Sequence, residues 1–105
     1  MYHTTDRSGV TDINPSDEKL KELLLAVGDD EDDDGSNPDV WLTHLETGWT
    51  VSVFPDGYVT LENNIRPVPE WEMDGLSNPR IFSLWKLLAN GDIEALRSQP
   101  WRKRS

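Results

Sequence analysis

The densest group of residues that could do chemistry is an acidic loop at residues 29–38, with the sequence DDEDDDGSNP. Asp30, Asp32 and Asp34 alternate along it and a glycine follows, as in positions one, three, five and six of a calcium-binding loop. Position twelve is Trp41, however, where a bidentate glutamate should close the coordination shell. Two interpretations follow: a calcium site on Asp30, Asp32 and Asp34, or a solvated acidic loop without metal.

The net charge of the chain favours a basic partner. There are 20 Asp and Glu against 10 Lys and Arg, which gives −10 at pH 7. A field of this sign repels phosphate backbones, so we expect no nucleic-acid partner. It attracts a basic protein, or it only keeps the chain soluble. The residues predicted to steer a partner are Asp30, Asp32, Asp33 and Asp34.

Aromatic side chains are the second group with binding chemistry, because Trp and Tyr are enriched at the centres of protein interfaces. Of the five Trp, Trp49, Trp71 and Trp85 fall on patterns of buried residues and are expected in the core. The predicted surface anchors are Trp41 and Trp101 and, at the tip of a hairpin, Phe54 and Tyr58.

Catalytic chemistry finds little support in the chain. The absence of Cys excludes thiol nucleophiles, disulfides and zinc–thiolate sites. His3 and His44 are the only histidines. Glu46 and Glu62 are the only companions the sequence suggests for His44 as a general base. No nucleophile elbow, phosphate-binding loop or metalloprotease motif occurs. We therefore predict that the protein is not an enzyme, and we assign no catalytic residue.

The elements that must position these residues are clearest over residues 40–62, read as VWLTHL, ETG, WTVSVF, PDG and YVTLE. Period-two alternation, broken twice by turns that end in Gly, predicts a three-stranded antiparallel meander. The predicted register pairs Val53 with Val59 and Val51 with Leu61 on the core face, and Ser52 with Thr60 and Thr50 with Glu62 on a face open to water.

The buried face of the first strand stays undecided at this point. Either Val40, Leu42 and His44 face the core, or Trp41, Thr43 and Leu45 do, depending on how the turn at residues 46–48 is built. The role of Trp41 as an anchor depends on this choice.

Two helices are expected beside the sheet, over residues 15–27 and 79–90. Asn14 and Asn78 are the predicted N-caps, each followed by Pro at the first helical position. Residues 70–74 alternate again and predict a fourth strand, and a short helical piece is expected over residues 92–97. The apolar stripes of the two main helices are Leu20, Leu23, Leu24 and Val27, and Ile81, Leu84, Trp85 and Leu88.

The predicted architecture is therefore α+β: one domain over residues 1–105, with an antiparallel sheet of about four strands covered on one face by the two main helices. Residues 1–12 are either loose or an edge strand, and residues 102–105 form a basic tail that is either disordered or folded onto the acidic surface. No signal peptide or transmembrane span is visible, so we expect a cytoplasmic protein that does not bind membranes.

The chain also resembles a known family. The residues that carry this resemblance are Gly48-Trp49-x-Val51-x-Val53-Phe54, Gly57, Glu62-Asn63, Leu84-Trp85, Gly91 and Pro100-Trp101. Over residues 40–101 it looks like the small acidic α+β immunity proteins of bacterial polymorphic toxin systems. The resemblance implies a non-catalytic inhibitor that binds and blocks a cognate toxin, and it assigns no role to any single residue. The alternative function is a calcium-responsive module built on residues 30–36.

Overall fold

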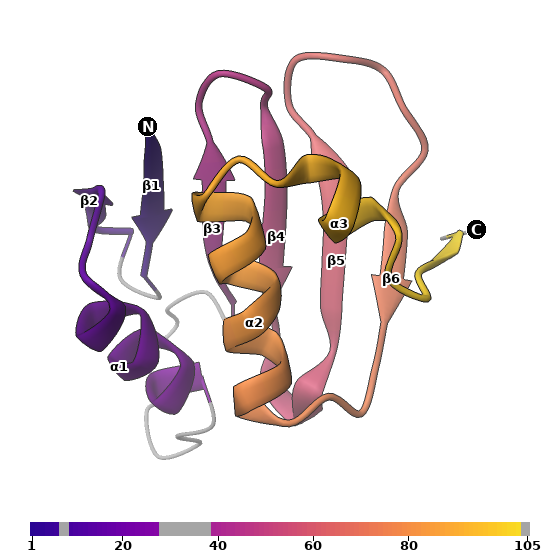
Figure 1. The fold of residues 1–105 in the computed structure, drawn as a ribbon. Helices are drawn as coiled ribbons and strands as arrows, with labels where there is room; N and C mark the ends of the chain where they lie inside the picture. The colour runs from indigo at the N-terminus through magenta and orange to yellow at the C-terminus, as the bar shows by residue number, and fades with distance from the viewer. Residues whose placement is uncertain (7–8, 28–38, 104–105) are drawn as a thin grey trace.

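The protein, described here by a computed structural model over residues 1–6, 9–27 and 39–103, has an α+β fold (Figure 1). Within these residues seven strands form one antiparallel sheet in the order β2-β1-β3-β4-β5-β6-β7, accompanied by three α-helices. The strands are β1 (Tyr2–Thr5), β2 (Thr11–Ile13), β3 (Val40–His44), β4 (Trp49–Val53), β5 (Val59–Asn63), β6 (Trp71–Met73) and β7 (Arg102–Lys103), and the helices are α1 (Asp17–Val27), α2 (Asn78–Ala89) and α3 (Ile93–Arg97).

The α+β class is confirmed, but the sheet is larger than the four strands predicted. The N-terminal segment, predicted to be loose or an edge strand, contributes two strands: β2 lies at the edge of the sheet, and β1 lies inside it between β2 and β3. At the other end, part of the predicted basic tail forms β7 beside β6. β1, β2 and β7 contain only four, three and two residues. Such short segments carry too little alternation to be recognised without their partners.

The predicted register of the meander is confirmed at every pair. Val53 lies opposite Val59, and Ser52 lies opposite Thr60. The other two predicted pairs, Val51 with Leu61 and Thr50 with Glu62, are also present. The turn between β4 and β5 is a short 3₁₀ segment, Pro55–Gly57, that ends with Gly57 at φ +74°. Glycine adopts this left-handed conformation without steric cost, which is why the PDG sequence closes the hairpin.

The face of β3 is settled by its pairing with β4. Leu42 lies opposite Val51 and Val40 opposite Val53, and all four side chains are buried in the core. Trp41 therefore points away from the core, on the same face as its cross-strand partner Ser52.

Both main helices begin close to their predicted starts, but with different caps. α1 starts at Asp17, and the Ser16 hydroxyl accepts a hydrogen bond from the Lys19 N–H at 3.3 Å. α2 starts one residue earlier than predicted, and the Ser77 hydroxyl accepts from the Arg80 N–H at 3.4 Å. Serine therefore takes the capping role that the two asparagines were expected to have.

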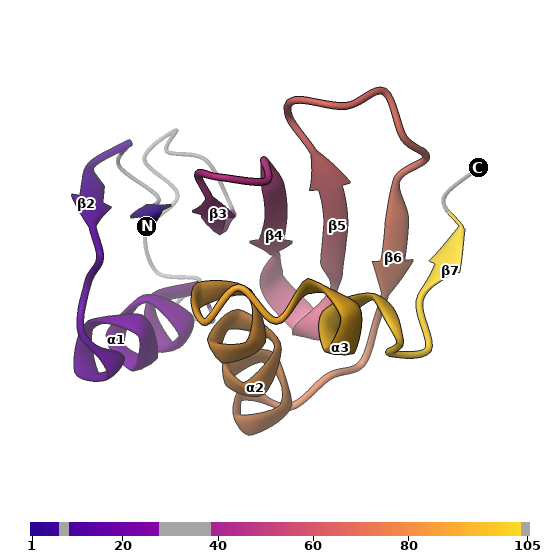
Figure 2. The same ribbon diagram turned by 45° about the horizontal axis from the view of Figure 1, so that its top comes forward.

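All three helices lie on one side of the sheet (Figure 2). Their apolar stripes pack on the core face of the strands, and Trp85 also donates its indole N–H to the Val51 carbonyl of β4 at 3.2 Å. The helix residues predicted for the core are all buried: Leu20, Leu23, Leu24, Val27, Ile81, Leu84, Trp85 and Leu88.

The opposite side of the sheet, called the helix-free face below, is not open to water as predicted. Thr50, Ser52 and Thr60 are only 2%, 5% and 4% exposed. They sit on β4 and β5, near the middle of a seven-stranded sheet, so each has neighbouring side chains on both flanking strands. A wider sheet shields small side chains that would be exposed in a sheet of four strands.

Candidate partner-binding surface

One row of cross-strand neighbours runs over the helix-free face from edge to edge. Directly opposite residues of antiparallel strands share a face, so the pairing of each strand with the next defines the row. The row takes one residue from every strand: Thr11, Thr5, Trp41, Ser52, Thr60, Glu72 and Arg102.

Three of the four aromatic residues predicted as surface anchors, Trp41, Phe54 and Tyr58, lie on this face. Trp41 belongs to the row itself. Phe54 and Tyr58 follow and precede core residues of β4 and β5 in extended backbone, so their side chains alternate to the helix-free face. Their rings are 5.4 Å apart between centroids, and all three side chains are half-buried. Trp101, by contrast, packs against the core and donates its indole N–H to the Leu96 carbonyl at 2.8 Å.

Several threonine hydroxyls of the helix-free face are hydrogen-bonded within the protein. The Thr43 and Thr50 hydroxyls are 2.8 Å apart, and the Asn64 side-chain amide donates to the Thr50 hydroxyl at 3.0 Å. On β1 and β2, the Thr5 and Thr11 hydroxyls are 3.1 Å apart. A partner covering these hydroxyls would meet polar groups that already have hydrogen bonds, which lowers the cost of removing water.

A cluster of charged residues lies at the end of the row, at the edge formed by β6 and β7. Sequence reasoning did not predict this cluster. The Arg102 guanidinium donates to Asp74 at 3.0 Å and to Glu72 at 3.4 Å. These carboxylates raise the pKa of Arg102 above its ordinary value, first through the hydrogen bond to Asp74 and with a smaller effect from Glu72 and Tyr58. The alternation in EWEMD places Glu72 and Trp71 on opposite faces of the strand. Nothing local in the sequence reveals the pairing of Glu72 with Arg102.

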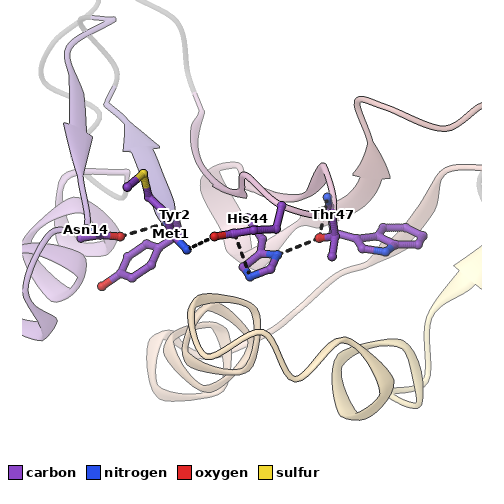
Figure 3. A network of polar contacts seen from close by, with 7 residues as sticks. Met1, Tyr2, Asn14, His44 and Thr47 are labelled. Carbon is purple, nitrogen blue, oxygen red and sulfur yellow. Dashed lines mark hydrogen bonds and ion pairs between the residues drawn. The ribbon is translucent and has the colours of Figure 1, made fainter.

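His44 lies on the core side of β3 in a polar network with the turn that follows it (Figure 3). Its Nδ1 is 2.8 Å from the Thr47 hydroxyl, and its Nε2 is 3.3 Å from a carboxylate oxygen of Glu46. The Met1 amino group donates to the other Glu46 oxygen and is the largest cause of the lowered pKa of Glu46. Figure 3 also shows Tyr2 held by Asn14, which ties β1 to the segment before α1.

The His44 network has the residue types of a catalytic hydroxyl, base and carboxylate, but it is packed between β3 and the α2–α3 connection. The ring is largely covered, with a side-chain exposure of 12%, and Gly91 of the α2–α3 connection packs close to its Nε2. Three cavities among the described residues are lined by other side chains. Glu46 is confirmed as a companion of His44, and the arrangement suits a structural link between β3 and the turn.

Another cavity lies between the outer surfaces of α1 and α2. It has a volume of about 560 Å³ and is lined by apolar groups, with the Lys21 ammonium 5.1 Å from the centroid of the Phe82 ring. None of the predicted anchors lines it. We favour the helix-free face as the functional surface because the aromatic and acidic side chains gather there, whereas an open groove between two helices is a common consequence of packing.

The predicted calcium ligands Asp30, Asp32 and Asp34, together with Asp33, lie outside the described residues. Over the part of the chain that the structure describes, no three His, Asp or Glu side chains are grouped as metal ligands. Trp41, at position twelve of the calcium pattern, lies within β3, where its neighbours are Thr5 and Ser52.

Comparisons with protein-family models, curated proteins and solved structures found no match to this chain. Among the described residues, no helix is both long and apolar enough to cross a membrane.

Proposed function

We propose that this chain is a non-catalytic binding protein that docks or inhibits a basic protein partner through its helix-free face. The observation that carries this proposal is the placement of Trp41, Phe54 and Tyr58 on one face, half-buried, with Glu72 and Asp74 at its edge. Aromatic anchors surrounded by polar groups are the usual composition of an interface centre.

Binding would proceed in two steps with separate physical causes. The net charge of −10 attracts a basic protein and accelerates encounter by about tenfold or more at low ionic strength. The anchors then supply the buried contact. Because Trp41 is within β3, and Phe54 is hydrogen-bonded to Tyr58 at the end of the β4–β5 hairpin, little conformational freedom is lost when the partner arrives. The acidic residues 29–34 add to the attracting field in this proposal.

A narrower form of the proposal makes the protein an immunity-type inhibitor, and its support is the resemblance of residues 40–101 to that group. In this form the basic partner is a toxin, and binding covers the toxin's active surface. Co-expression of a captured partner with this chain in a growth assay separates the two forms. Rescue of growth supports the inhibitor, whereas capture of a harmless protein leaves the broader binding function.

The test is retention of a partner by immobilised full-length protein, comparing the wild type with single substitutions. We expect one basic protein from the lysate of the source organism to be retained at low salt and released as salt is raised. Trp41→Ala and Phe54→Ala should each reduce its retention at least tenfold, the usual effect of removing an interface anchor.

Phe82→Ala is the matched control, because Phe82 is also a half-buried aromatic residue but lies on α2, on the opposite side of the sheet. Circular dichroism of all variants shows whether the fold is kept. Equal retention by the wild type and both anchor variants would remove the helix-free face from the proposal.

A further inference from the structure

A basic segment of the chain occupies the acidic edge of the helix-free face. β7 consists of Arg102 and Lys103, both exposed, paired antiparallel with the outer edge of β6. Arg102 lies opposite Glu72 and contacts both carboxylates of the edge, Glu72 and Asp74. The protein therefore holds a short basic strand of its own at the place where the proposed function needs a basic partner.

The contacts that hold β7 are few and exposed. Its pairing with β6 extends over two residue pairs, Trp71 with Lys103 and Glu72 with Arg102. The side chains of Arg102 and Asp74 are 58% and 65% exposed. Ion pairs this exposed contribute little to stability, and short terminal pairs of a sheet open locally at low cost.

The firm anchor of this segment lies just before β7, not within it. Trp101 packs against the core and is bonded through its indole N–H to the Leu96 carbonyl at 2.8 Å. Because this anchor precedes β7, Arg102 and Lys103 can leave β6 while Trp101 stays in place. The outer edge of β6, with Glu72 and Asp74, would then be exposed without unfolding of the core.

We propose that β7 is a displaceable placeholder, and that an extended basic segment of the partner pairs with β6 in its place and binds Glu72 and Asp74. This inference rests on the proposed function and deepens it by naming the part of the partner that is recognised. Main-chain hydrogen bonds to a sheet edge supply affinity in this mode of recognition, and alternate side chains supply specificity.

The geometry also specifies the pattern of the incoming segment. Residues two apart on a strand point to the same face, so every second side chain would face the acidic edge, as Arg102 does. Arginine suits this position better than lysine, because its planar guanidinium presents several donors and can satisfy two carboxylates together. Tyr58 directly precedes β5, whose Val59 pairs with Met73 of β6, and its ring is 5.4 Å from that of Phe54, so a longer segment would extend along the face toward both rings.

The first test measures binding of a fluorescent synthetic peptide, in which arginine alternates with valine, to the full-length chain by anisotropy. Arg102→Ala removes the competing side chain and should tighten binding by roughly threefold to tenfold relative to the wild type. Arg66→Ala is the control, since it removes the same charge from the exposed β5–β6 connection. Adding Glu72→Gln and Asp74→Asn to the Arg102→Ala chain should abolish binding, and a peptide with glutamine in place of arginine should not bind.

The second test locks β7 in place. Trp71 and Lys103 are directly opposite, and the chain has no native Cys, so Trp71→Cys with Lys103→Cys offers one disulfide within the chain. The oxidised protein should bind the peptide at least tenfold more weakly than the same protein reduced. Because both states have the same sequence, any effect of losing the Trp71 side chain cancels.

The placeholder inference would be overturned if the peptide bound the oxidised and the reduced double-cysteine protein with equal affinity. Equal affinity for Arg102→Ala and Arg66→Ala would overturn it as well. The proposed function is judged separately, by release of the native partner in Trp41→Ala and Phe54→Ala but not in Phe82→Ala. If the anchor substitutions release the partner but the disulfide does not weaken peptide binding, the proposed function stands and the placeholder inference is wrong.

Discussion

At the scale of single residues, Gly57 connects the hairpin that carries Phe54 and Tyr58 to the segment before α2. Its φ is +74°, and a Cβ at this position would clash with the Leu76 carbonyl oxygen and lie 2.7 Å from the Leu76 nitrogen. The Leu76 N–H donates to the Gly57 carbonyl at 3.1 Å, so the two backbones cannot separate without losing this bond. Glycine is needed here both for its conformation and for its lack of a side chain.

Gly57→Ala should therefore destabilise the protein more than Gly75→Ala. Gly75 has a similar φ of +67°, but a Cβ there meets nothing within 4 Å. We expect about 1–2 kcal/mol of left-handed strain in both variants, and about 1–3 kcal/mol more for overpacking in Gly57→Ala. Urea unfolding of both variants measures the difference, and equal losses would show that the backbone at Leu76 yields freely.

Trp41 illustrates how much of the candidate surface follows from residue types. Its aromatic character and its strand were predictable, but its face was not, because the turn at residues 46–48 sets the register of β3 against β4. The structure decides this through Leu42 opposite Val51. The burial of Thr50 and Thr60 was beyond local reasoning as well, because it depends on neighbouring strands that are distant in sequence.

At the scale of elements, the strands that sequence analysis found and those it missed differ in length and in partner. β3, β4 and β5 have five residues each and are joined by turns with Gly, so alternation and turn chemistry identify them together. β2 and β7 are too short for a pattern and exist only through pairing with β1 and β6. The acidic edge at Glu72 was missed for this reason, since its partner strand had no signal of its own.

The connection between α1 and β3 carries the calcium alternative, and the position of Trp41 provides a test of it. A calcium loop needs its twelfth residue to supply two carboxylate oxygens, whereas Trp41 is held within β3 between Thr5 and Ser52. We therefore expect thermal unfolding to be the same in millimolar calcium and in chelator. A ligand at a hundred times its dissociation constant would add about 2.7 kcal/mol, so an upward shift in Tm that is absent from Asp32→Asn would establish the site instead.

At the scale of the whole molecule, the imbalance of charge competes with the ion pairs seen in the structure. Twenty acidic residues face ten basic ones, so ten negative charges remain that the Lys and Arg side chains cannot neutralise. The ion pairs among the described residues are largely exposed, such as Lys86–Asp17, whose side chains are 33% and 55% exposed. Exposed pairs of this kind are each worth less than about 1 kcal/mol, whereas the excess negative charge repels itself over the whole molecule.

Added salt should therefore stabilise this protein, because it screens repulsion more than it weakens attraction. The Debye length falls from about 30 Å at 0.01 M salt to about 10 Å at 0.1 M, which is within the dimensions of a domain. We expect the urea midpoint at pH 7 to rise with sodium chloride over this range, with the slope m unchanged. Urea is the suitable denaturant because it carries no charge. A midpoint that falls with salt would mean that ion pairs such as Arg102–Asp74 outweigh the net charge, and would make displacement of β7 by a basic partner more costly than we infer.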